Sequence, residues 1–122
     1  MKIIKVAING ANGRMGLAIK EVIKNNTQIE LVAEITRNDT LEYNNADVII
    51  DFSSEEGLRT LLQNANCKIV SGTTGLSQET FQMMKQYGKE KNGIIWGSNT
   101  SFGVNLMFAM VKKLGSILNA NE

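Results

Sequence analysis

The chain has 122 residues, of which 43% are hydrophobic and 20% are charged, and its formal net charge is +1. This length fits one domain with a core of its own, and this balance of residues is typical of globular rather than disordered proteins. A net charge so close to zero gives no broad positive field that would attract nucleic acid or an anionic membrane, so we expect neither as a partner.

In the first half of the chain, apolar runs alternate with an amphipathic stretch. Residues 2–8, 29–35 and 46–52 are Val/Ile-rich and predict three strands. Residues 14–26 have helical spacing, and one apolar face of this helix would carry Met15, Ala18, Ile19, Val22 and Ile23. The link 36–45 is short for a crossover between parallel strands, so a bare loop or a single turn is expected there.

The second half repeats the alternation. Residues 55–65 and 78–92 predict helices, the first capped by Ser53 or Ser54 and the second by Ser77. Residues 67–72 and 93–97 predict two more strands, and residues 104–118 predict a last, largely apolar helix. Strands of this kind, separated by helices, are typical of a parallel sheet covered on both faces. The predicted fold class is therefore α/β, with a doubly wound parallel sheet.

Several chemistries are excluded by residues that the chain lacks. It has no histidine and a single cysteine, Cys67, so an internal disulfide and the usual zinc ligand sets cannot form. The lack of histidine also removes the most common acid or base near neutral pH. Cys67 heads an apolar run and is expected to act as a small buried hydrophobe. No segment is typical of a signal peptide or a membrane span, so we expect a cytoplasmic protein.

The turn after the first strand, INGANGRMG (8–16), sets three glycines three residues apart. A helix N-terminus offers unpaired N–H groups and a positive dipole end, to which phosphate binds. Gly10 would allow the tight turn, Gly13 the approach of a diphosphate, and Gly16 close packing of helix against strand. Arg14 would add a direct charge. Because the motif follows a strand and opens a helix, we predict a Rossmann-like NAD(P)-binding domain over residues 1–122 rather than a mere connecting turn.

The residue at the end of the second strand normally determines which nicotinamide cofactor is preferred. A carboxylate there binds the ribose of NADH, and an arginine binds the 2'-phosphate of NADPH. Thr36 and Arg37 stand at this point, Glu34 lies two residues earlier, and Asp39 lies further into the loop. We therefore predict NADPH, with NADH as the alternative.

Two further strand ends carry polar, glycine-rich turns, VSGTTGLS (70–77) and GSNTSFGVN (97–105). Together with INGANGRMG and IIDFSSEEG (49–57), these motifs resemble those of dihydrodipicolinate reductase, the NAD(P)H-dependent enzyme of the diaminopimelate route to lysine. The resemblance covers nearly the whole chain and corresponds to the N-terminal cofactor domain of that family.

The resemblance implies a set of cofactor-binding residues. The diphosphate would be held by Gly10, Ala11, Asn12, Gly13, Arg14 and Met15, and the adenosine-ribose phosphate by Arg37. The nicotinamide half would meet Phe52, Gly72, Thr73, Thr74, Gly97, Ser98, Asn99 and Thr100. Taken alone, Phe52 fits a core position, and Thr73 and Thr74 fit residues that satisfy the backbone of a turn.

The chain also departs from the family. The segment after Arg37 is short, and Thr36 stands where an acidic partner is often found. The family's second domain, with its histidine-rich motif, catalytic lysine, dicarboxylate pocket and tetramer interface, has no counterpart here, so no catalytic residue is expected. We expect a truncated chain or gene fragment that binds NADPH without reducing the dicarboxylate substrate. Surplus apolar surface on the helix 104–118 fits a missing domain, a sister chain in a homo-oligomer, or the chain's own sheet.

Two other hypotheses remain at this stage. A regulatory Rossmann module that senses a nucleotide or CoA would bind ADP, CoA or NAD more tightly than NADPH. A complete small reductase would need a tyrosine or lysine acid beside the nicotinamide. Tyr43 and Tyr87 are expected in a loop and on a helix, which disfavours this second hypothesis.

Overall fold

A computed structural model of the chain describes residues 3–36, 43, 45–91, 93–97, 109 and 113. Helices and strands alternate in the order β1 (Ile4–Asn9), α1 (Arg14–Lys24), β2 (Ile29–Ile35), β3 (Val48–Asp51), α2 (Glu55–Asn64), β4 (Lys68–Ser71), α3 (Gln78–Glu90) and β5 (Ile94–Trp96). Each of these elements was predicted from the sequence to within two residues at either end. The helix predicted over residues 104–118 lies outside the described residues, apart from Ala109 and Lys113, and so does most of the link 36–45.

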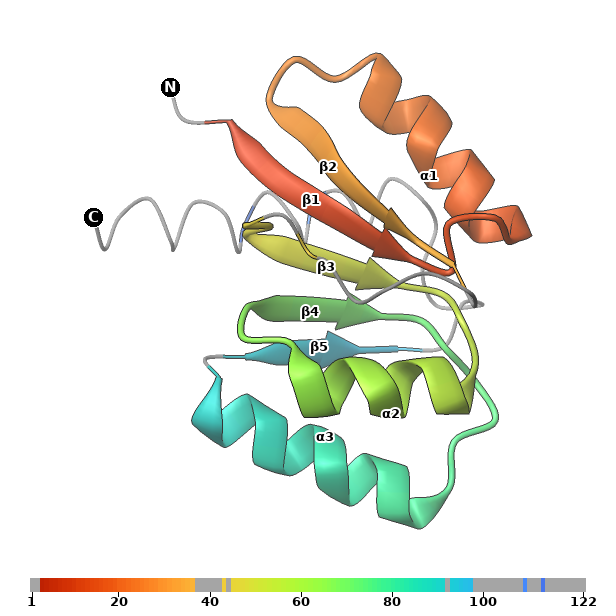
Figure 1. The fold of residues 1–122 in the computed structure, drawn as a ribbon, viewed down its shortest axis with the longest axis vertical. Helices are drawn as coiled ribbons and strands as arrows, with labels where there is room; N and C mark the ends of the chain where they lie inside the picture. Colours follow the sequence, from red (N-terminus) through yellow and green to blue (C-terminus); the bar gives the residue numbers. More distant parts are fainter. Residues whose placement is uncertain are drawn as a thin grey trace.

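The five strands form one parallel sheet in the order β2-β1-β3-β4-β5 (Figure 1). The predicted doubly wound α/β fold is therefore confirmed. The chain moves from β1 to β2 in one direction and then returns to the other side of β1 to form β3. Ligands of such sheets bind at this reversal, outside the carboxyl ends of the strands.

The core has two parts because neighbouring residues of a strand point to opposite faces of the sheet. On one face, Ile8 of β1 and Ile50 of β3 pack with Ile19 of α1. On the other face, Ile49 of β3 packs with Leu58 of α2 and with residues of α3. The strands are thus buried on both sides, which explains their continuous Val/Ile runs.

Cys67, directly before β4, packs against the core on the α2 and α3 face. Its side chain is half-buried, and burial raises the pKa of its thiol to about 11. A thiol with so high a pKa is almost entirely protonated at neutral pH and is a poor nucleophile. This agrees with the expected role of Cys67 as a small hydrophobe.

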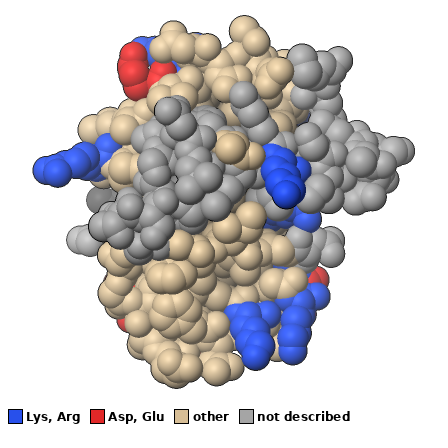
Figure 2. Space-filling model, turned by 180° about the vertical axis from the view of Figure 1, so that it is seen from behind, with Lys and Arg blue, Asp and Glu red and all other residues tan. Residues whose placement is uncertain are grey.

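The charged side chains on one face of the molecule are not gathered in one field. On the described part of the face turned away from the viewer in Figure 1, Lys and Arg side chains stand apart in small groups (Figure 2). An anion site must therefore be built locally, from backbone groups and a few side chains. Among the described helices, none combines the length and hydrophobicity that a membrane-spanning segment requires.

Candidate functional site

The turn after β1 needs glycine at Gly10 for two independent reasons. Its φ of +85° lies in the left-handed region that L-residues with side chains rarely adopt. A Cβ atom at Gly10 would also lie 2.8 Å from the carbonyl carbon of Phe52, in the segment that follows β3. The chain therefore makes the predicted tight turn, with the backbone after β3 lying directly against it.

Gly16 brings the first turn of α1 against the same backbone. A Cβ atom there would lie 2.7 Å from the carbonyl oxygen of Ala11 and closer still to that of Gly10. The sequence predicted close packing of this helix against the strand. In the structure the contact falls just beyond the strand, on the turn itself, because β1 ends at Asn9.

The N-terminus of α1 differs from those of the other two described helices. Its N-cap is Gly13, which offers no side-chain hydrogen bond, and its first turn contains no acidic residue. By contrast, α2 is capped by Ser54 and α3 by Ser77, and acidic residues stand in the first turn of each. Ser54, rather than Ser53, is thus the cap of α2. The first turn of α1 thus has neither a side-chain cap nor a carboxylate of its own to balance the positive end of the helix dipole.

The hydrogen bonds of the turn show which N–H groups are available there. The N–H groups of Gly10 and Ala11 both donate to Ile35 O, at 3.0 and 3.2 Å, and that of Gly13 donates to Gly10 O at 3.1 Å. The first helical hydrogen bond runs from Leu17 N to Gly13 O at 2.9 Å. The N–H groups of residues 14–16 precede this bond and have no acceptor within the helix.

This result narrows the predicted diphosphate contacts. Ala11 is fully buried and its N–H is bonded, so neither its side chain nor its amide faces a ligand. The same holds for the amide of Gly10. The N–H groups without an acceptor in the helix are those of Arg14, Met15 and Gly16, at its start. Gly13 is exposed, and a Cβ atom there would make ordinary contacts with Gly10 O at 3.4 Å and Phe52 O at 4.0 Å, so a side chain would fit at this position.

An open cleft of about 740 Å³ lies beside this turn. Its walls come from the ends of β1, β2 and β3 and from the start of α2: Asn9, Gly10, Asn12, Gly13, Thr36, Phe52, Ser53, Ser54, Glu56, Gly57 and Thr60. The cleft therefore lies at the reversal of strand order, where this fold class binds its ligands. Among the described residues of this lining, Glu56 is the only one with a charged side chain, and it stands on the α2 side, so within this part of the cleft an anion is favoured on the α1 side.

The carboxyl ends of β1, β3 and β4 form a row of buried polar residues that sequence reasoning missed. Asn9, Asp51 and Ser71 occupy the same register position on adjacent strands. Asp51 is fully buried and accepts hydrogen bonds from both of these residues. The only signal in the sequence was that each apolar strand ends in a polar residue, which does not reveal that the three side chains meet.

Phe52 and Gly72 were predicted to contact a cofactor, and the structure brings them against each other. A Cβ atom at Gly72 would lie 2.5 Å from Cζ of the Phe52 ring. Gly72 is buried and Phe52 is half-buried. The missing side chain at Gly72 thus makes room for the Phe52 ring, which fits the core role that Phe52 would have when taken alone.

Thr73, predicted to contact the nicotinamide half or to satisfy the backbone of a turn, points its hydroxyl into the protein. Its hydroxyl donates to Asp51 Oδ2 at 2.7 Å and accepts from Ser53 N at 3.0 Å, and the residue is only 4% exposed. Its carbonyl oxygen accepts from Nε1 of Trp96 at 2.8 Å. Thr73 is therefore bound within the protein, whereas Thr74 is exposed and keeps the predicted freedom to meet a ligand.

Of the predicted residues that remain, Gly97 is described, and it directly follows β5. Gly97 donates its N–H to Ser71 O at 3.1 Å, which places it beside the end of β4. Arg37, Ser98, Asn99 and Thr100 lie outside the described residues.

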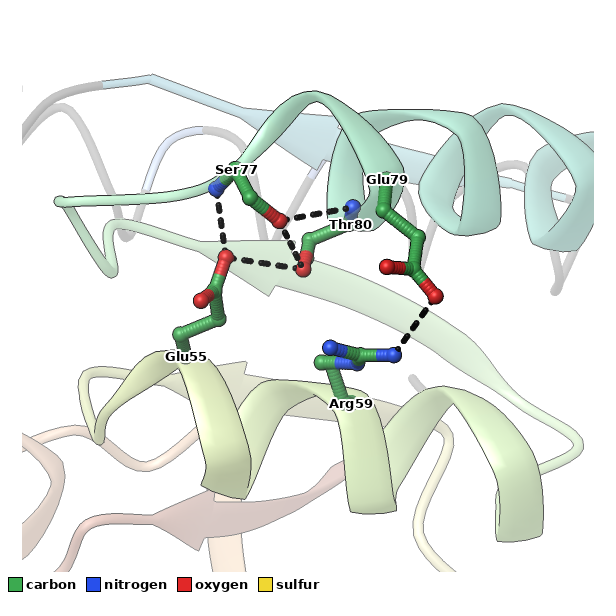
Figure 3. Close-up of polar contacts among 5 residues, drawn as sticks. All are labelled: Glu55, Arg59, Ser77, Glu79 and Thr80. Atoms are coloured by element: carbon green, nitrogen blue, oxygen red, sulfur yellow. Dashed lines mark hydrogen bonds and ion pairs between the residues drawn. The ribbon is translucent and has the colours of Figure 1, made fainter.

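A polar cluster joins the N-terminal parts of α2 and α3 (Figure 3). The carboxylate of Glu55 accepts from the backbone N–H of Ser77 and, at 2.9 Å, from the hydroxyl of Thr80. Arg59 pairs with Glu79 at 3.0 Å. The hydrogen bond from Ser77 is the largest of the effects that lower the pKa of Glu55 below its ordinary value. Glu55 thereby ties the start of α2 to the end of the segment 72–77.

Comparison with known proteins gives a consistent result. The family model "Dihydrodipicolinate reductase, N-terminus" matches residues 4–45 and 36–100. The 4-hydroxy-tetrahydrodipicolinate reductase of Bdellovibrio bacteriovorus is 37% identical over 123 residues, which cover 96% of this chain and 53% of that protein. The enzyme of the same name from Campylobacter jejuni serotype O:6 is 37% identical over 120 residues, covering 94% of this chain and 49% of the relative.

Among solved structures, dipicolinate-bound dihydrodipicolinate reductase from Paenisporosarcina sp. TG-14 matches with a TM-score of 0.60 and 26% identity. The match covers 78% of this chain and 47% of that one. The chain thus spans about half the length of the relatives it matches.

The packing at Gly16 predicts the effect of adding one methyl group. Gly16→Ala should lower the free energy of unfolding by about 1–3 kcal/mol, because the methyl group meets two backbone carbonyls that cannot move aside. Gly88→Ala in α3 is the matched control, since its Cβ would meet only Cγ2 of Ile94, at 3.4 Å. That variant should be as stable as the wild type or more stable, because alanine favours helix. Urea unfolding measures the free energy of unfolding of both variants. An equal loss in Gly16→Ala and Gly88→Ala would contradict the packing at Gly16.

The contact between Glu55 and Ser77 predicts a pH dependence of stability. Because the pKa of Glu55 is lowered in the folded state, its contribution is present above the ordinary pKa of glutamate and is lost as the pH falls through the lowered value. Glu55→Gln should therefore reduce the free energy of unfolding at pH 7, and the gap to the wild type should close below about pH 4.

Glu56→Gln removes the same charge from the same helical turn and serves as the control for this prediction. It should have a smaller effect at pH 7 than Glu55→Gln. Equal losses in the two variants would mean that the helix dipole, and not the bond to Ser77, accounts for the effect.

Proposed function

Since the chain belongs to the dihydrodipicolinate reductase family, we propose that it is the NADPH-binding domain of a reductase that acts on a cyclic dicarboxylate. The observation that carries the proposal is the uncapped N-terminus of α1 beside a cleft at the switch in strand order. This N-terminus lies within the residues that match the family model. Open N–H groups, a positive dipole end and a missing side chain are what a diphosphate needs for close approach.

In this proposal the diphosphate is held on the α1 side of the cleft. The N–H groups of Arg14, Met15 and Gly16 donate to it, and the guanidinium of Arg14 adds a charge. Gly13 allows the approach, because a side chain at that position would stand in front of the free amides. Gly10 acts indirectly, and Gly16 has a second role beside its N–H group: the missing side chains of both let the helix begin so close to the strand end.

The choice of NADPH is also a proposal, with NADH as the alternative. An acidic residue at the end of the second strand would favour NADH by binding the ribose hydroxyls. Glu34, the acidic residue nearest this strand end, is paired with Nζ of Lys20 at 2.8 Å. Thr36 borders the cleft, and Arg37 follows it in the sequence. Arg37 is proposed to bind the 2'-phosphate of NADPH.

The nicotinamide half would lie toward β4 and β5, against Thr74, Gly97 and residues 98–100. When bound, the cofactor would supply a hydride to the ring of the substrate, while this chain's residues bind and orient it. Tyr87 does not fit as a proton donor. Its hydroxyl donates to the carbonyl of Cys67, which lies at the amino end of β4, and burial raises its pKa. The alternative of a CoA-sensing module finds no support in the comparisons.

The proposed diphosphate site can be tested without disturbing the fold. Gly13→Asp and Gly13→Asn both place a strong N-cap residue at the start of α1, so neither should destabilise the protein. The aspartate should weaken NADPH binding by at least about tenfold more than the asparagine, because its negative charge stands where the diphosphate would bind. Trp96, the only tryptophan, reports binding through quenching of its emission. A wild-type protein that shows no quenching at about 1 mM NADPH would refute the proposal.

The proposed cofactor preference has its own test. Arg37→Ala should reduce the affinity for NADPH by about tenfold to a hundredfold, the value of a charge-assisted contact to phosphate, and should leave the affinity for NADH unchanged. Arg14→Ala should lower the affinity for both NADPH and NADH, since both cofactors contain the diphosphate. Equal losses for NADPH and NADH in Arg37→Ala would contradict the proposed role of Arg37.

A further inference from the structure

Asp51 is a buried carboxylate that none of the cofactor contacts uses. It ends β3 and is 0% exposed. Its Oδ1 accepts from Nδ2 of Asn9 at 2.9 Å and from the Ser53 hydroxyl at 2.6 Å. Its Oδ2 accepts from the hydroxyls of Ser71 and Thr73, both at 2.7 Å. Two donors thus serve each oxygen, which is the full complement of an ionised carboxylate.

For Ser71 and Thr73, other hydrogen bonds leave the hydroxyl proton directed at Asp51, whereas the Ser53 hydroxyl also has Ser54 O within 3.3 Å. The Ser71 hydroxyl accepts from Thr73 N at 3.2 Å, and the Thr73 hydroxyl accepts from Ser53 N at 3.0 Å. Each hydroxyl therefore receives one hydrogen bond and directs its single proton at the carboxylate. The amide nitrogen of Asn9 can only donate. A protonated Asp51 would turn one acceptor into a donor and break this pattern.

The contacts described for Asp51 contain no cation, so neutral dipoles hold its charge. Burial holds the pKa of Asp51 above its ordinary value, and the four hydrogen bonds lower the pKa without cancelling the effect of burial. Removing one partner of a buried charge is costly, because the charge is then left short of donors. Each of the four donors is consequently fixed in place by the carboxylate that it serves.

These donors belong to the segments that surround the proposed cofactor site. Asn9 directly precedes the glycine turn, and Ser53 lines the cleft. Thr73 lies in the loop after β4, and its carbonyl holds the indole of Trp96. We propose that Asp51 is an ionised positioning residue that holds the ends of β1, β3 and β4 in the arrangement that receives the cofactor. The role of Asp51 in cofactor binding rests on the proposed function. The ionisation of Asp51 and its hydrogen bonds to the loops do not depend on that function.

The first measurement uses the wild-type chain without cofactor. The ¹³C chemical shift of the Asp51 carboxyl should have the value of a carboxylate at pH 7, and the value of a protonated acid would overturn the proposal. Thr73→Val keeps the shape of the side chain and removes one of the four donors. It should raise the pKa at which Asp51 titrates, an effect that a purely structural role would not produce, and an unchanged pKa would contradict the proposal.

The second measurement compares Asp51→Asn with Asp47→Asn, also without cofactor. Asp47 directly precedes β3, at the opposite end from Asp51, and its Oδ2 accepts from Lys5 N at 2.9 Å, so this variant removes the same charge away from the loops. In Asp51→Asn, the amides of Ser53 and Thr73 should exchange hydrogen at least about tenfold faster, while those in the middle of β3 change little. In Asp47→Asn the two loop amides should exchange as in the wild type. Equal acceleration of loop and core amides would overturn the proposal.

A titration with NADPH then separates this proposal from the proposed function. Asp51→Asn should weaken NADPH binding by about tenfold or more, and Asp47→Asn should not. If the wild type itself does not bind NADPH, the proposed function fails while the ¹³C and exchange results still decide the role of Asp51. If the wild type binds and Asp51→Asn binds equally well, the positioning role for the cofactor is refuted.

Discussion

The close approach of three backbone segments is the constraint on which the rest of the site depends. The turn after β1, the first turn of α1 and the segment after β3 share a space in which Gly10 and Gly16 leave no room for a Cβ atom. This packing fixes the start of α1 beside the switch in strand order, and Gly13 as its N-cap leaves the first N–H groups of the helix without a side-chain partner. The other two described helices start with a serine cap and acidic residues, so they satisfy their own N-termini.

Anion binding in this protein would thus come from backbone geometry rather than from accumulated charge. A net charge of +1 offers no general attraction for a dinucleotide, but oriented amides and one arginine act over the short distance at which a diphosphate binds. Asp51 is held by the same means, because an amide and three hydroxyls take the place of a counter-ion. Both arrangements require the loops to be rigid, since dipoles stabilise a charge only when they are already oriented toward it.

The sequence predicted the fold almost completely, because burial of the strands on both faces and the serine caps leave local patterns. It predicted the glycine turn for the same reason, since φ and close approach act on single residues. It could not predict that the Thr73 hydroxyl would turn inward to Asp51 or that Phe52 would lie on Gly72. These contacts depend on the register between β3 and β4, which local periodicity does not encode. Cofactor preference rests on Arg37, which lies outside the described residues.

The central claim is that the free amides at the start of α1 receive the diphosphate of a nicotinamide dinucleotide. A titration of the ¹⁵N-labelled chain with NADPH, followed by amide chemical shifts, tests it most directly. The account predicts that the largest shifts occur at Arg14, Met15 and Gly16, and that the first-turn amides of α2 and α3 move little. Saturation with NADPH that leaves the amides of residues 14–16 unchanged would contradict it.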